Sequence, residues 1–103
     1  MRKIIDGLRY DTEKATKIHD WSNGHYRNDF YYCCETLYRT GNGAFFLHGQ
    51  GGALSKYGER CAQGMGASEN IVPLLREDAI QWLLEHDGDE VVEEKFPDAF
   101  EEA

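Results

Sequence analysis

The sequence predicts an α+β fold, in which a small antiparallel β-sheet packs against two main helices beside an N-terminal β-hairpin. Three observations lead to this prediction. Asp6-Gly7 lies between apolar residues, as in a tight hairpin turn. Residues 30–39 and 44–48 are rich in aromatic residues and are separated by glycines, which is typical of paired strands. Residues 76–86 carry apolar residues at helical spacing.

Length and composition indicate one domain. The chain has 103 residues, 41% of them hydrophobic, which is enough for a single modest core. We expect residues 1–103 to form one domain with an acidic C-terminal segment at 85–103. No apolar run reaches membrane length, and no signal peptide is expected at the N-terminus. The three cysteines, an odd number, favour a reduced cytoplasmic protein over a disulfide framework.

After the N-terminal hairpin, the sequence predicts the first main helix. Asp11 or Thr12 can supply an N-cap oxygen for a helix over residues 13–21, which has apolar residues on one side. Gly24 is a candidate left-handed residue that ends it.

The central strand pair follows at residues 30–39 and 44–48. Alternation places one set of side chains on one face: Phe30, Tyr32, Cys34, Thr36 and Tyr38. The other face carries Tyr31, Cys33, Glu35, Leu37 and Arg39. Because both faces carry rings, we expect this hairpin to be central and partly covered on both sides. Exposed tyrosines on it are an alternative dimer surface, and the sequence leaves the oligomeric state open.

The rest of the chain carries secondary-structure signals of unequal strength. The glycine-rich residues 49–70 suggest a short strand or turn near 54–57 and then a loop. Residues 71–74 predict an edge strand, because Pro73 lacks an N–H group. Residues 76–86 predict the second main helix, and a last helical turn can begin at Pro97.

The net charge is confined to the C-terminal segment. Residues 85–103 hold nine carboxylates and one lysine, which account for the whole formal charge of −8. The remainder of the chain has equal numbers of acidic and basic side chains. A dense anionic surface repels nucleic acids and membranes and attracts basic proteins. The alternative interpretation is a solvated acidic tail that only aids solubility.

Catalytic and metal-binding patterns are weak. Cys33 and Cys34 point to opposite faces of a strand, Cys61 is distant, and no zinc-type spacing occurs. His48 could pair with Cys33 or Cys34 for nucleophilic catalysis, although a packed imidazole is the favoured interpretation. We therefore predict no catalytic residues, metal or cofactor.

Several stretches together resemble a family of small phage- and plasmid-encoded proteins that includes anti-CRISPR proteins. They lie at residues 3–16, 21–24, 35–40, 51–59 and 71–84. Leu75 stands where the family has a polar N-cap. The resemblance implies a non-enzymatic inhibitor in the bacterial cytoplasm that binds a CRISPR effector, of type I, and blocks target DNA binding.

The charge pattern suggests how such inhibition could work. A folded protein with fixed carboxylates could occupy a cationic DNA channel as a DNA mimic. The predicted partner-binding residues are Asp87, Asp89, Glu90, Glu93, Glu94, Asp98, Glu101 and Glu102. The expected partner is a basic nucleic-acid-binding protein such as a Cas subunit, without direct contact to nucleic acid or membrane. Another basic host protein is the first alternative, and a small Cys/His enzyme is the second.

Overall fold

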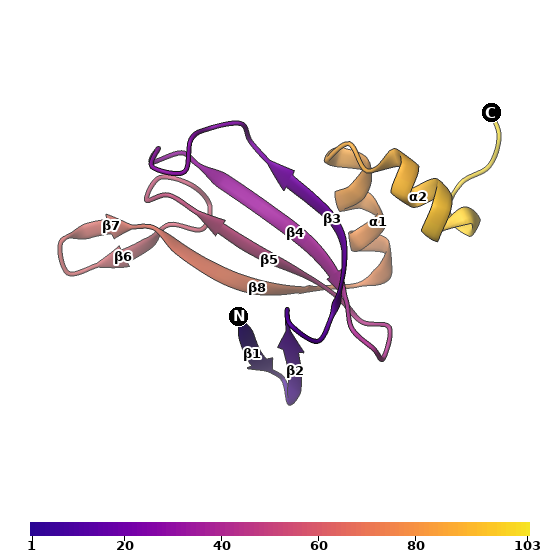
Figure 1. Cartoon of the computed structure of the whole chain (residues 1–103), viewed down its shortest axis with the longest axis horizontal. Helices are drawn as coiled ribbons and strands as arrows, with labels where there is room; N and C mark the ends of the chain where they lie inside the picture. Colours follow the sequence, from indigo (N-terminus) through magenta and orange to yellow (C-terminus); the bar gives the residue numbers. More distant parts are fainter.

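The computed structural model describes residues 1–103 and consists of three antiparallel sheets and two α-helices (Figure 1). The elements in chain order are β1 (Arg2–Ile5), β2 (Leu8–Asp11), β3 (Thr16–Ser22), β4 (Cys33–Arg39), β5 (Phe45–Gly51), β6 (Glu59–Cys61), β7 (Gly64–Gly66), β8 (Ser68–Leu74), α1 (Arg76–Glu85), α2 (Asp89–Lys95) and the 3₁₀ turn η1 (Pro97–Ala99). The α+β prediction is confirmed. No helix has the length and apolar character needed to span a bilayer.

The main sheet has four strands in the order β3-β4-β5-β8. The predicted central pair is confirmed, since β4 and β5 lie in the middle and pair in register from Cys33↔Gly51 to Arg39↔Phe45. The predicted alternation holds from Cys33 on: Cys33, Glu35 and Leu37 are buried, whereas the residues between them are only partly buried. The predicted strand began at residue 30, but residues 30–32 lie outside β4, and the Tyr32 N–H donates to the Asp29 carbonyl in a turn. Pro73 lies in β8, as predicted for an edge strand. Because an edge strand has a neighbour on one side only, it can accommodate the missing N–H of Pro73.

Both helices pack at one end of the main sheet (Figure 1). Ala79, Trp82 and Leu83 are the buried face of α1. They form one core cluster with Leu37, Phe45, Leu47, Val92 and Phe96. Each large apolar side chain buried in this way stabilises the fold by roughly 1.5–3 kcal/mol. The core therefore joins the central strands to α1, and α1 to the acidic C-terminal segment.

The N-terminal hairpin contributes to a second, smaller core. The turn residues Asp6 and Gly7 both have positive φ, at 50° and 80°, as the Asp-Gly sequence predicts. Tyr10 at the end of β2 packs edge-on against Phe46, with ring centroids 5.5 Å apart. Since Phe46 alternates along β5 with the residues of the first cluster, the hairpin covers the opposite face of the sheet.

The predicted helix over residues 13–21 is wrong, because Thr16–Ser22 forms β3 and pairs antiparallel with β4. The predicted N-cap at Asp11 is present, but it caps only a single turn. The side chain of Asp11 accepts a hydrogen bond from the Glu13 N–H at 2.9 Å, and its carbonyl accepts from the Ala15 N–H at 3.1 Å. The chain does not continue this turn into a helix. The residues of β3 pair instead with β4, where their backbone groups form interstrand hydrogen bonds.

The second helix of the fold lies instead within the acidic segment. Residues 89–95 form α2, which directly follows the confirmed helix α1, and η1 begins at Pro97 as predicted. In the glycine-rich region, residues 54–57 form a turn rather than a strand, and β6 and β7 form a small separate hairpin.

Candidate functional site

The helix α2 is anchored on one side and acidic on the other. Val92 and Phe96, one turn apart, are 3% and 4% exposed and belong to the main core. At about 100° per residue, its four carboxylates span an arc of roughly 140°, which begins about 60° from Val92 at Asp89 and extends to the side opposite Val92 at Glu90 and Glu94. These are Asp89, Glu90, Glu93 and Glu94, and all four are exposed. The apolar positions therefore fix the direction in which the charges point.

These four carboxylates are closely spaced. The seven residues of α2 extend over roughly 10 Å at about 1.5 Å per residue. One carboxylate therefore occurs about every 2.6 Å along the axis, compared with about one phosphate charge per 1.7 Å in duplex DNA. The outer face of α2 thus has a linear charge density of the same order as that of a nucleic acid.

The other predicted partner-binding residues flank this helix. Asp87 lies in the connection from α1 with a φ of 61°. Asp98, in η1, accepts a hydrogen bond from Arg76 at 2.8 Å, and this bond lowers the pKa of Asp98. Glu101 and Glu102 follow η1 in the exposed C-terminal extension (Figure 1). We define the acidic surface as the eight predicted residues; six lie on or beside α2, and two extend beyond it.

The structure reveals a buried charged network that the sequence did not predict. The carboxylate of Glu35, on β4, is 1% exposed and accepts hydrogen bonds from three side chains. These are Tyr57 Oη at 2.5 Å, Trp82 Nε1 at 3.1 Å and Lys56 Nζ at 2.8 Å. Burial alone would raise the pKa of Glu35, but the hydrogen bonds outweigh it and lower that pKa. For Tyr57, burial and the adjacent carboxylate both raise the pKa.

Gly49 makes room for this network. Gly49 is the cross-strand partner of Glu35, and a Cβ atom built on it would lie 1.8 Å from Cζ of the Tyr57 ring. The ring therefore lies directly on the β5 backbone, where only glycine permits it. The loop of residues 52–58 is held against the sheet through this contact, which explains part of the glycine richness in this region.

His86 extends the network to β3. Its Nδ1 lies 2.6 Å from the Trp82 carbonyl, and its Nε2 lies 3.6 Å from Glu35 Oε1. Nε2 of His19 lies 2.9 Å from the His86 carbonyl. One buried carboxylate thus joins the 52–58 loop and α1, and the histidines join the end of α1 to β3. The signal for this site was present in the sequence, since alternation had placed Glu35 on the same face as Leu37.

The alternative Cys/His site is not assembled in the structure. His48 faces Thr36 across the β4–β5 ladder, and its Nε2 lies 3.7 Å from a carboxylate oxygen of Glu69. Cys34 Sγ accepts a hydrogen bond from the Gln50 amide at 3.4 Å. Burial raises the pKa of Cys33, which disfavours the thiolate form that a nucleophile requires. No hydrogen bond joins His48 to either cysteine.

The comparisons with known proteins identify no relative. No protein family, curated protein or solved structure matches this chain. No cluster of three or more His, Cys, Asp or Glu side chains suitable for a metal ion occurs in the structure. The case for a function therefore depends on the geometry of the acidic surface.

Proposed function

We propose that this protein is a non-enzymatic inhibitor whose acidic surface occupies the cationic, nucleic-acid-binding groove of a partner protein. The resemblance noted in the sequence favours a CRISPR effector of type I as this partner, and the target DNA of the effector would then be excluded. The alternative partner is another basic host protein bound through the same surface.

The observation that carries this proposal is the arrangement of charge on α2. Asp89 and Glu93, and likewise Glu90 and Glu94, are like charges four residues apart. Each such pair destabilises a helix by about 0.2–0.5 kcal/mol. Val92 and Phe96 nevertheless hold the helix against the core. An ordered helix that keeps unfavourable charge pairs on its exposed face is suited to a basic partner that neutralises them.

The physics of binding follows from this charge density. A groove lined with Lys and Arg attracts a dense row of carboxylates as it attracts phosphates, and complementary potentials accelerate the encounter. Fixed spacing supports specificity, because the partner meets the charges in one arrangement. Binding of this kind is expected to weaken steeply as the salt concentration rises.

The test compares two triple variants that change charge equally. Glu90→Gln/Glu93→Gln/Glu94→Gln removes three charges from the outer face of α2, whereas Glu13→Gln/Glu59→Gln/Glu69→Gln removes three exposed charges elsewhere. Each protein is expressed in strains that carry different CRISPR types, and transformation by a targeted plasmid is counted. We expect the wild type and the control triple to restore transformation in a type I strain, and the α2 triple to fail.

Melting temperatures distinguish lost binding from lost folding. The α2 triple is expected to melt at or slightly above the temperature of the wild type, since it removes like-charge repulsion. If both triples retain full inhibition, the acidic surface is not the binding site. If the wild type inhibits no CRISPR type but binds DNA-binding host proteins in a way that the α2 triple abolishes, the partner is the alternative one.

A further inference from the structure

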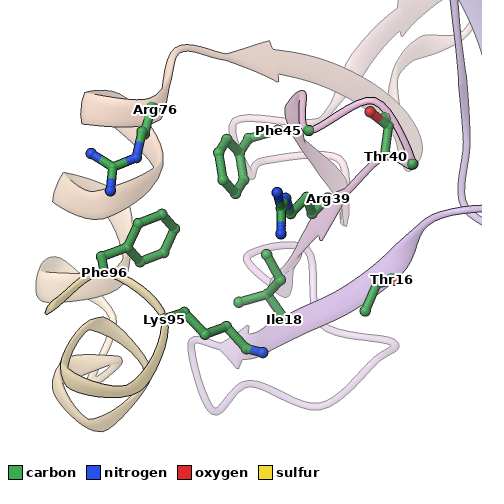
Figure 2. A pocket seen from close by; sticks show the side chains of 10 residues that line it. Thr16, Ile18, Arg39, Thr40, Phe45, Arg76, Lys95 and Phe96 are labelled. Carbon is green, nitrogen blue, oxygen red and sulfur yellow. The ribbon is translucent and has the colours of Figure 1, made fainter.

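A cationic cavity lies beside α2, on the side away from its acidic face. Its volume is about 620 Å³, and it is bounded by β3, the turn between β4 and β5, the start of α1 and the end of α2. The lining residues that matter here are Arg39, Arg76, Lys95, Ile18, Phe45 and Phe96. Figure 2 shows Arg39, Arg76 and Lys95 at the border of this space, on three different segments of the chain, with the Arg76 guanidinium directed away from Arg39 and Lys95.

The charge of this cavity contrasts with that of the whole protein. The chain has a formal net charge of −8, yet the lining contains three cations and no carboxylate. Arg76 is paired with Asp98, which does not line the cavity. Arg39 and Lys95 take part in none of the ion pairs of the structure. Two cations without ion-pair partners therefore line the same cavity as a third.

The lining also has an apolar part, formed by Ile18, Phe45 and Phe96, beside two threonines and two glycines. Phe45 and Phe96 are buried, with ring centroids 5.6 Å apart, and the Arg76 guanidinium lies 5.0 Å from the Phe96 ring centroid. Ile18 is half-buried beside them. The cavity thus combines an apolar wall, formed by core residues, with cationic groups. Arg can bind a carboxylate or phosphate through two parallel hydrogen bonds, and Lys adds a compact charge.

From this combination we infer that the cavity binds a small organic oxyanion, in which a phosphate or carboxylate group meets Arg39 and Lys95 and an apolar body packs toward Ile18 and Phe96. Arg39 and Lys95 are both exposed and take part in no ion pair, so their charges are available to an anion in the cavity. Such a ligand would contact the sheet, α1 and α2 together. This inference is independent of what the acidic surface binds.

The experiment uses four probes on the full-length protein. Phenyl phosphate and benzoate carry an oxyanion on a ring, inorganic phosphate lacks the ring, and benzyl alcohol lacks the charge. Amide chemical shifts are followed by NMR up to about 10 mM probe, a range that detects millimolar dissociation constants. We expect saturable shifts at Arg39, Gly41, Gly43, Arg76 and Lys95 with one or both ring-bearing anions. Their order of affinity decides between phosphate and carboxylate as the preferred group.

Substitution of Arg39 and Lys95 tests whether these residues bind the anion. Arg39→Gln/Lys95→Gln is expected to weaken binding at least about tenfold, equivalent to about 1.4 kcal/mol, whereas the control Lys3→Gln/Arg60→Gln leaves it unchanged. The single variants Arg39→Gln and Lys95→Gln provide the same test with less perturbation of the fold. Absence of saturable binding by both ring-bearing anions would overturn the inference. Equal weakening by the cavity and control variants would also overturn it, because it would indicate a diffuse charge effect.

Discussion

Glu35 and the carboxylates of α2 place negative charge in opposite surroundings. Glu35 is buried beneath α1 and accepts hydrogen bonds from Tyr57, Trp82 and Lys56. The four carboxylates on the outer face of α2 lie in solvent, and none takes part in an ion pair. A buried charge persists only where partners satisfy it, so Glu35 is tied to the fold. Charges that make no such contacts can change without loss of the fold, which leaves them free for a partner.

The largest expected effect is at Glu35. Glu35→Ala leaves the Tyr57 hydroxyl and the Trp82 N–H without their acceptor, so we expect a loss of about 3–5 kcal/mol in the free energy of unfolding. Urea denaturation followed by tryptophan fluorescence measures this loss. Any decrease in inhibition should match the decrease in folded protein. A fully folded Glu35→Ala variant with specifically abolished inhibition would reverse the roles that we assign to the two sites.

The next largest expected loss of stability is at Gly49. Gly49→Ala places a methyl group on the Tyr57 ring and should displace the ring from Glu35. We expect a loss of about 1–3 kcal/mol, as for other overpacked sites. Gly41→Ala is the matched control, because nothing lies within 4 Å of a Cβ at Gly41. Equal melting temperatures for the two variants would show that Tyr57 does not depend on the β5 backbone.

The smallest expected effect is the dependence of folding stability on pH that arises from Glu35. The pKa of Glu35 is lower in the folded protein than its ordinary value of 4.5. As the pH falls below that value, the unfolded chain takes up the proton first. The stability from Glu35 is therefore complete above pH 4.5 and is lost as the pH falls through the folded pKa.

Denaturation at several values between about pH 5 and pH 3 measures this loss. Glu35→Gln should lose less stability over this range than the wild type, whereas the α2 triple should keep the wild-type response at Glu35. An identical acid response in Glu35→Gln and the wild type would contradict the hydrogen-bonded network.

The comparison also shows which features local sequence can predict. The Asp6-Gly7 turn, the β4–β5 pair and α1 depend on signals within a few residues, and all three were predicted. β3 was not, because its strand conformation is set by pairing with β4 while its local signal, the Asp11 cap, favours a helical turn. α2 was missed because its seven residues depend on two distant core contacts, through Val92 and Phe96.

The acidic surface, the cationic cavity and the Glu35 network also differ in how far the sequence reveals them. The acidic surface is visible in the sequence because its residues all lie within one short stretch, residues 87–102. The cationic cavity is not, because Arg39, Arg76 and Lys95 are far apart in the chain and meet only in the folded protein. Glu35 lies between these cases: alternation marked it as a charge on a core face, but its donors Tyr57 and Trp82 come from the loop and α1.

The central claim is that the acidic surface works because α2 holds it in order, and a variant that keeps every charge tests this most directly. Val91→Gly/Val92→Gly removes an apolar anchor and lowers helix propensity by up to about 1 kcal/mol per residue, while all eight carboxylates remain. NMR should show β4, β5 and α1 intact and residues 89–95 released, and the plasmid assay should show inhibition lost. Full inhibition by this variant with α2 released would contradict the account.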